Sequence, residues 1–217
     1  MNGVAKIYVQ GPLKKGETEL FTLLPTLLST GFQKDDIARI QPIDPHNLTC
    51  ESIFNIYDPF LKRGKIPPFS PMAAHLPMAS IAEMYTFANI IQNAATLSAP
   101  EDNVIIILDS RAIARRDYFT KLRDTIEKGW DCLSLAHNPA TLPSDADTSI
   151  FSDSQIYEHE PMTPITSGAL ALRLSYVKKI VKTILPFRDP LNYELIFQTL
   201  VHKVTPKYLY PPIFDCR

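Results

Sequence analysis

The stretch VIIILDSR, residues 104–111, is the most informative part of the sequence. Its first five residues are all apolar, without the polar and apolar alternation of a half-exposed strand. Such a run predicts a strand covered on both faces, as in a parallel or mixed sheet flanked by helices. Ligands of open α/β sheets bind beyond the carboxyl ends of the strands, where we expect Asp109 to stand. The alternative is that Asp109 only caps a helix expected at 116–128.

Strand and helix patterns alternate on both sides of this stretch. The remaining strands are expected at 5–10, 36–42, 130–136, 168–172 and 207–210, and the remaining helices at 17–29, 78–97, 175–185 and from 189 onward. Asp189 is a candidate N-cap for the last helix, with Pro190 as its first residue. No interior stretch is typical of a linker, so we predict one α/β domain over residues 1–217, with a mixed, mostly parallel sheet.

Composition narrows the classes of function. The net charge of -1 and the pI of about 6.5 leave no overall basic field, which argues against nucleic acid or an anionic membrane as the principal partner. No apolar run approaches the roughly 20 residues that span a bilayer, and the first residues do not resemble a signal peptide. We therefore expect a cytoplasmic protein. Three scattered cysteines and five dispersed histidines favour neither a disulfide framework nor a zinc site.

Common nucleotide motifs are missing from the sequence. The chain has seven glycines and contains neither GxGxxG nor GxxxxGK[ST], which argues against a dinucleotide or ATP site and a Rossmann methyltransferase. A long polar and acidic stretch, Asn138–Glu160, is expected to be a mobile loop or an active-site lid. The proline-rich stretch Lys65–Pro77 is expected to be an ordered surface loop.

Three segments carry a resemblance to a known class of enzyme. They are VIIILDSR at 104–111, TSGALALRLSYVKKIV at 166–181 and DPLNYELIFQTL at 189–200. Together with the order of strands and helices, they resemble nucleotide-sugar glycosyltransferases of the GT-A fold. Within that class they are most similar to glycosyltransferase family 25, the lipopolysaccharide and collagen galactosyltransferase group. The resemblance implies a GT-A-like, Rossmann-like single domain.

The resemblance also implies an activity and a donor site. The expected reaction moves a sugar from a nucleoside diphosphate sugar, a UDP-sugar first of all, to a hydroxyl of a glycan or glycoprotein acceptor, with inversion. The implied donor-binding residues are Gln10, Gly11, Asp109, Ser110, Arg111 and Gly168. The implied catalytic base is Glu194 or Asp189, although acids in the first turn of a helix are also explained by its dipole.

One departure from the family concerns the metal. The family has two or three acids after the central strand, whereas this chain has Asp109, Ser110 and Arg111. Asp109 is therefore the single candidate ligand for Mn²⁺ or Mg²⁺, and the need for a divalent metal is open. Arg111, Arg115 and Arg116, and more weakly Lys14 and Lys15, are alternatives for neutralising the leaving diphosphate. The reduced motif keeps a second hypothesis open, a catalytically silent GT-A-like binding or assembly module.

Overall fold

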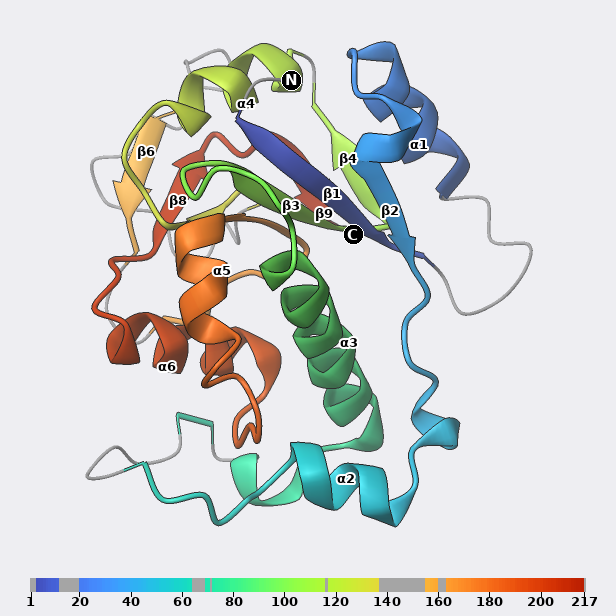
Figure 1. Cartoon of the computed structure of the whole chain (residues 1–217), viewed down its shortest axis with the longest axis vertical. Helices are drawn as coiled ribbons and strands as arrows, with labels where there is room; N and C mark the ends of the chain where they lie inside the picture. The colour runs from blue at the N-terminus through green and yellow to red at the C-terminus, as the bar shows by residue number, and fades with distance from the viewer. Residues whose placement is uncertain are drawn as a thin grey trace.

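A computed structural model describes residues 3–11, 20–63, 69–70, 72–115, 117–136, 155–159 and 163–216. Its centre is a seven-stranded sheet with the strand order β2-β1-β3-β7-β5-β8-β6 (Figure 1). These strands are β1 Val4–Gln10, β2 Ile37–Ile40, β3 Val104–Asp109, β5 Cys132–Ser134, β6 Gln155–Glu158, β7 Ala169–Arg173 and β8 Lys207–Tyr210. A second sheet pairs β4, Ala112–Ala114, with β9, Phe214–Cys216.

The main sheet is mixed, and most of its strands run in one direction. β1 is parallel to both β2 and β3, and β5 is parallel to β8. β7 is antiparallel to its neighbours β3 and β5, and β6 is antiparallel to β8. Only β7 and β6 therefore run against the other strands of this sheet. The predicted fold class, a mixed and mostly parallel α/β sheet with a Rossmann-like arrangement, is confirmed.

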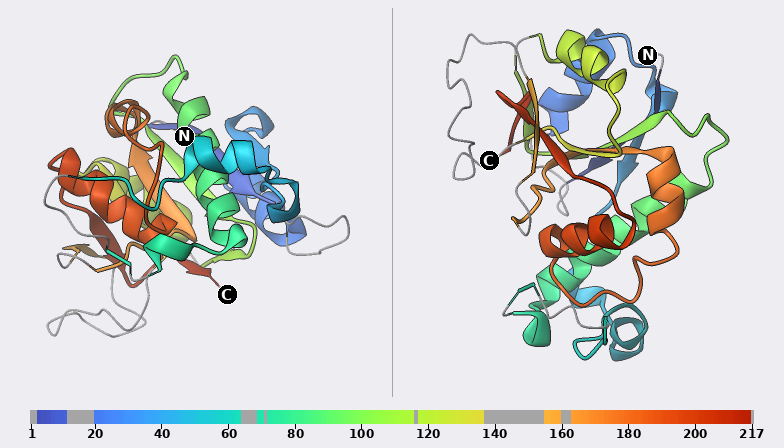
Figure 2. Two further views of the ribbon diagram at one scale, coloured as in Figure 1. Left: turned by 90° about the horizontal axis from the view of Figure 1, so that it is seen from below. Right: turned by 90° about the vertical axis from the view of Figure 1, so that its left-hand side faces the viewer.

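Helices cover both faces of the main sheet (Figure 2). They are α1 Leu20–Ser29, α2 Cys50–Ile56, α3 Met78–Ala95, α4 Tyr118–Ile126, α5 Leu174–Ile180 and α6 Leu191–Val201, with short 3₁₀ turns η1 Lys34–Asp36, η2 Pro45–Asn47 and η3 Ala73–His75. α3, α5 and α6 pack in the core of one face, while α1 and α4 pack in the core of the other. Among these helices none is both long and apolar enough to cross a membrane.

β3 contributes to both cores, as its apolar run predicts. Ile105 and Ile107 point into the core formed with α3, α5 and α6, whereas Ile106 and Leu108 point into the core formed with α1 and α4. All four side chains are almost completely buried. Burying one such side chain contributes about 1.5–3 kcal/mol, so this strand is a large source of stability. It also holds Asp109 firmly at the end of the strand.

The capping explanation for Asp109 is wrong. β4 lies between Asp109 and α4, so Asp109 is far from the first turn of that helix in sequence. α4 begins at Tyr118, after Asp117 in a left-handed conformation with φ of 62°. The sequence pattern places the helix start near 116 because it does not reveal the short strand pair with β9, whose partner lies about a hundred residues later.

Two further expectations need correction, and one helix was not expected. Asp189 does not cap α6, because Pro190 occupies the N-cap position and the Asp189 side chain binds elsewhere. Within the expected lid, 155–158 form the edge strand β6, and 138–154 and 160 lie outside the described residues. α2 is not predicted, although Thr49 and Ser52 form a capping box at its start. In the proline-rich loop, 65–68 and 71 lie outside the described residues.

Candidate functional site

The ends of three strands and the start of a fourth meet at one edge of the main sheet. Gln10 is the register partner of both Ile40 and Asp109, so β1, β2 and β3 end side by side. The backbone N–H of Ser110 donates to the carbonyl of Gln10 at 2.9 Å, and the N–H of Asp109 donates to the carbonyl of Gly168 at 2.8 Å. We call this group the carboxyl edge; it consists of Gln10, Gly11, Asp109, Ser110, Arg111 and Gly168. All six residues expected to bind the donor therefore lie together.

Local backbone chemistry explains why the chain turns at this edge. The Asp109 carboxylate accepts a hydrogen bond from the backbone N–H of Arg111 at 2.8 Å, which closes a tight turn directly after β3. The turn buries Ser110 and directs the Arg111 side chain back toward Asp109. Gly11 follows β1, and its N–H donates to the carbonyl of Ile40 at 3.0 Å. Two neighbouring strands thus end in fixed turns.

Asp109 and Arg111 form the charged centre of the carboxyl edge. Nε of Arg111 donates to Oδ1 of Asp109 at 3.0 Å, and Nη2 donates to Oδ2 at 2.8 Å. The pair is partly open to solvent, with exposed side-chain fractions of 57% for Arg111 and 30% for Asp109. Burial raises the pKa of Asp109, but the hydrogen bonds and the charge of Arg111 outweigh this and hold the pKa below its ordinary value. The carboxylate is therefore ionised at neutral pH.

Glu83 is a third charged group at this edge, and the sequence analysis missed it. It is an exposed residue between two buried residues of α3, yet its carboxyl group is partly shielded from solvent, and the charges of Asp109 and Arg111 act on it. Burial and then the negative charge of Asp109 raise the pKa of Glu83, and Arg111 lowers it in part. A helical pattern with an exposed acid does not reveal this proximity, because it depends on how α3 lies across the sheet.

Among the other candidate cations, the structure describes Arg115, which is paired away from the carboxyl edge. Arg115 donates to the Asp215 carboxylate from Nε at 3.0 Å and from Nη2 at 2.6 Å, an ion pair that joins β4 to β9. The position of the Arg115 side chain is therefore explained by its ion pair with Asp215 of β9. Arg116, Lys14 and Lys15 lie outside the described residues. Arg111 is thus the candidate cation that the structure places at the carboxyl edge.

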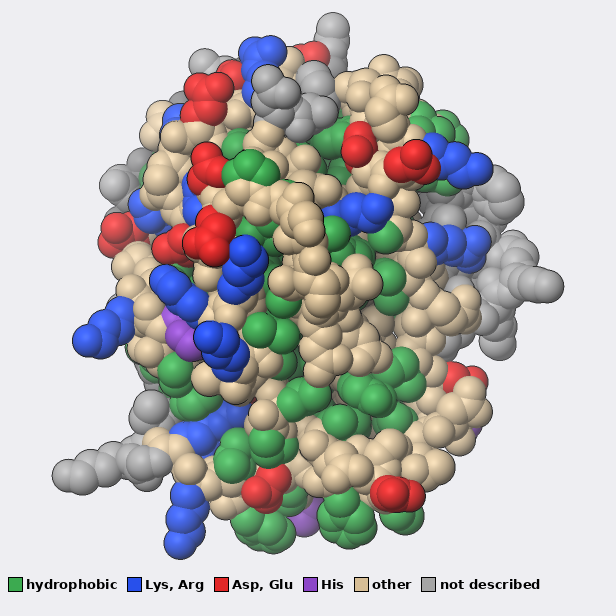
Figure 3. Space-filling model, in the orientation of Figure 1, with side chains coloured by type: hydrophobic (Ala, Val, Ile, Leu, Met, Phe, Trp, Pro, Cys, Tyr) green, Lys and Arg blue, Asp and Glu red, His purple; other side chains and the backbone are tan. Residues whose placement is uncertain are grey.

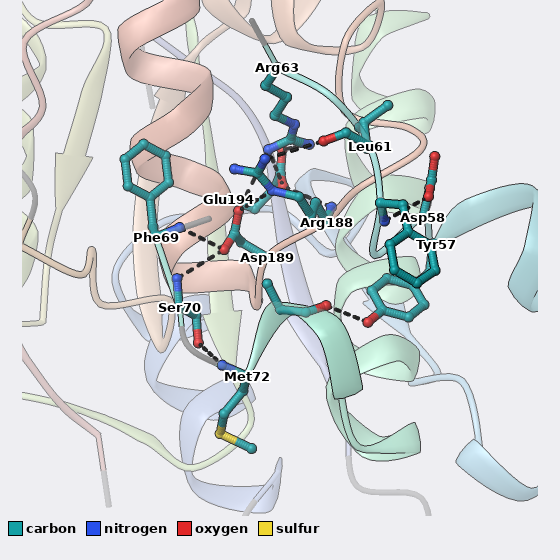
Figure 4. Close-up of polar contacts among 12 residues, drawn as sticks. Tyr57, Asp58, Leu61, Arg63, Phe69, Ser70, Met72, Arg188, Asp189 and Glu194 are labelled. Carbon is teal, nitrogen blue, oxygen red and sulfur yellow. Dashed lines mark hydrogen bonds and ion pairs between the residues drawn. The ribbon is translucent and has the colours of Figure 1, made fainter. Parts of the chain in front are cut away.

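The two candidate bases lie in a buried ionic cluster (Figure 4). Arg63 donates to both oxygens of Glu194, from Nη1 and Nη2, each at 2.9 Å. The guanidinium also lies 3.6 Å from the ring centroid of Phe197. Gln198 donates to Oε1 of Glu194 at 3.0 Å. The side chain of Glu194 has no exposed surface, and that of Arg63 is only 4% exposed.

Asp189 completes this cluster and binds the backbone at Phe69 and Ser70, which are distant in sequence. Its Oδ1 accepts the backbone N–H groups of Phe69 and Ser70, each at 3.0 Å, and its Oδ2 accepts Nε of Arg188 at 3.2 Å. Arg188 also donates to the carbonyl of Leu61 at 3.2 Å. We call Arg63, Arg188, Asp189 and Glu194 the buried ionic cluster. It joins the segment around 61–70 to the start of α6.

This geometry explains both acids by a structural role. Two carboxylates and two guanidinium groups balance in charge, as buried ions must. Burial raises the pKa of Glu194, while the charge and hydrogen bonds of Arg63 oppose that shift. Neither carboxylate is open to an acceptor hydroxyl in this arrangement, since both side chains have no exposed surface. Their role as catalytic base stays a prediction.

The fit of a divalent metal rests on the chemistry of Asp109. Both of its oxygens already accept hydrogen bonds from Arg111, and a cation already neutralises this single carboxylate. Within the described part of the chain, no three His, Cys, Asp or Glu side chains are grouped so that they could hold a metal ion. The described residues therefore do not fit a preformed metal centre.

Comparisons with known proteins assign no activity. No protein-family model and no curated protein matches the sequence. Among solved structures, the chain is similar to the crystal structure of A197 from STIV, with a TM-score of 0.47 and 12% sequence identity over 98% of this chain and 84% of that chain. A likeness at this level carries no information about substrate or mechanism.

Proposed function

We propose that the chain is a glycosyltransferase that binds a nucleoside diphosphate sugar, a UDP-sugar first of all, at the carboxyl edge. The sugar would pass to a hydroxyl of a glycan or glycoprotein acceptor, with inversion. The observation that supports this proposal is the meeting of Gln10, Gly11, Asp109, Ser110, Arg111 and Gly168 at one edge of the sheet. Ligands of open α/β sheets bind at such an edge.

Arg111 has the chemistry to neutralise the leaving group. Departure of the nucleoside diphosphate leaves negative charge on its phosphate oxygens, and a positioned guanidinium stabilises such charge. The Arg111 side chain is more than half exposed, so a ligand can reach it while Asp109 fixes its orientation. Asp109 itself, ionised and partly exposed, is suited to accept hydrogen bonds from the donor ribose or sugar hydroxyls.

Glu83 is the better-placed carboxylate for the general base. An inverting transfer needs one group that takes the proton from the acceptor hydroxyl as it attacks the anomeric carbon. Glu83 is exposed beside Asp109, and its raised pKa makes it a stronger base than an ordinary glutamate. Glu194 and Asp189 could act only if the buried ionic cluster opened.

The second candidate function is a silent GT-A-like binding or assembly module. Two observations favour it: Asp109 is engaged by Arg111, and Glu194 and Asp189 are engaged by Arg63 and Arg188. A silent module could bind a nucleotide sugar at the carboxyl edge but would not transfer or hydrolyse it. The two candidates therefore differ in turnover and not in binding alone.

The first experiment is a thermal-shift screen against nucleoside diphosphate sugars, each with and without Mn²⁺. It compares the natural protein with Asp109→Ala and with the control Asp215→Ala, which removes the acid of another partly exposed Arg–Asp pair. We expect one nucleotide class to stabilise the natural protein and Asp215→Ala, but not Asp109→Ala. Release of free nucleoside diphosphate in the presence of acceptor then distinguishes an enzyme from a silent module. Absence of any shift would contradict the transferase and would favour the silent assembly module.

A further inference from the structure

The surface formed by α5 and the end of α6 carries only positive charge over a long part of the chain. Between residues 174 and 210 the sequence has two acids, Asp189 and Glu194. Both are fully buried in the ionic cluster, so neither contributes to the surface. Figure 3 shows Lys and Arg side chains gathered over α5 on this face of the molecule.

Three lysines on this surface have no acid among the described contacts that neutralises them. They are Lys179, Lys182 and Lys203, and all three are exposed. Two nearby lysines are excluded from this set: Lys178 donates to Glu101 at 3.1 Å, and Lys207 lies opposite Glu158 in the pairing of β8 with β6. The acids therefore border the surface without entering it.

Contacts at His202 bring the two helices of this surface together. Nε2 of His202 lies 2.9 Å from the hydroxyl of Thr183, which follows α5, and its ring meets that of Tyr176 edge-on with centroids 6.0 Å apart. Burial, and then the charge of Lys179, lower the pKa of His202, which places Lys179 beside it. Lys203 follows His202 directly. Lys179 and Lys203 thus lie at one corner of the fold, and Lys182 follows Lys179 by three residues, just after α5.

Two aliphatic side chains stand exposed at the same corner. Leu200 and Val201, the last residues of α6, are 49% and 41% exposed, next to His202 and Lys203 in the chain. Cations alone are enough to bind a soluble polyanion. Binding to a bilayer with anionic lipids is strengthened both by cations and by apolar side chains that enter the interface. The combination at this corner matches the bilayer.

We propose that the corner formed by Lys179, Lys182, Lys203, Leu200 and Val201 binds peripherally to a membrane surface that contains anionic phospholipid. The near-zero net charge of the whole chain conceals this surface, because the compensating acids lie elsewhere. The proposal does not depend on the proposed transferase activity. It concerns adsorption to the membrane surface and involves no membrane-spanning segment.

Sedimentation with phosphatidylcholine vesicles, with and without phosphatidylserine, tests the proposal. We expect binding only when phosphatidylserine is present, and weaker binding at high salt. Lys179→Glu/Lys182→Glu should reduce the partition coefficient by on the order of 30-fold or more, since each lysine near such a surface contributes roughly fivefold. The control Lys121→Glu/Lys128→Glu makes the same change in net charge on α4 and its end, in the layer across the sheet, and should bind as the natural protein does.

A second pair of variants tests the apolar contribution. Val201→Thr should weaken vesicle binding by about threefold, because a hydroxyl replaces a methyl group that is proposed to enter the membrane interface. Ile113→Thr removes more apolar surface at a position of similar exposure on β4, and as the control it should have no effect. Equal binding of both charge-reversal variants, or no binding to either kind of vesicle, would overturn the proposal. Binding to RNA or an acidic peptide without binding to vesicles would overturn it as well.

Discussion

Arg63 and Glu194 form a two-point ion pair that is almost completely buried, with both nitrogen–oxygen distances at 2.9 Å. The two residues are 131 positions apart in the sequence. Their pairing connects the stretch of chain after α2 with the first turn of α6. The pair therefore joins two distant parts of the chain at the position where the family resemblance implies a catalytic base.

Removing Arg63 should strongly destabilise the fold. In Arg63→Met, Glu194 loses its two charge-assisted hydrogen bonds while it stays buried, and we expect a loss of about 3–5 kcal/mol in the free energy of unfolding. The adjacent Lys62 is exposed, so Lys62→Met should change this free energy by less than about 0.5 kcal/mol. Urea denaturation of both variants checks the prediction. Similar losses in the two variants would show that the pair contributes little.

Glu83 and Glu194 should respond differently to the same chemical change. We expect Glu83→Gln to keep or slightly raise the melting temperature at neutral pH, because the raised pKa shows that the ionised form is unfavourable there. The same change should lower sugar transfer by about 10²–10⁴-fold, as loss of a general base does. Glu194→Gln should lower the melting temperature, because Arg63 then faces a neutral amide in a buried site. The exposed Glu51→Gln is the control for both measurements. A fully stable but inactive Glu194→Gln protein would instead identify Glu194 as the base.

The carboxyl edge should show a measurable electrostatic coupling. Burial and the charge of Asp109 raise the pKa of Glu83, so Asp109→Asn should lower it partway toward the ordinary value, with burial still raising it. NMR titration of the side-chain carboxyl carbon measures this shift. Since the pKa is raised on folding, Glu83 contributes to stability below its unfolded pKa, near pH 4.3, and this contribution is lost as the pH rises through the folded pKa. An unchanged pKa in Asp109→Asn would mean that the two acids do not interact.

Gly3 is required by the contact between the start of β1 and α4. Its φ is +87°, and an added Cβ would lie 2.9 Å from Cγ2 of Ile126. Gly3→Ala should therefore destabilise the protein by about 1–3 kcal/mol, from backbone strain and overpacking together. At Gly129, an added Cβ would meet nothing within 4 Å, so Gly129→Ala should change stability by less than about 1 kcal/mol. Thermal unfolding of the two variants compares them directly, and equal effects would contradict this account.

The carboxyl edge was largely predictable from local sequence. The apolar run 104–108 determines a strand buried on both faces, and Asp109 to Arg111 determine the polar turn after it. Gly11 and Gly168 mark turns beside other strands. Since parallel strands end at a common edge, local pattern and general topology together were enough to bring these residues together.

The charged partners were not predictable in this way, because they depend on three-dimensional proximity between distant segments. Nothing near Arg63 in the sequence indicates Glu194, and an acid on α3 does not reveal that the charge of Asp109 acts on Glu83. Asp189 has the sequence features of a helix cap, yet its carboxylate accepts hydrogen bonds from the backbone N–H groups of Phe69 and Ser70 instead. The sequence by itself determined most of the strands and helices and the residues that meet at the carboxyl edge, since hydrophobic periodicity is a local property. Only the tertiary structure decided which charges are paired and which face solvent, since burial and partnership are set when the segments pack together.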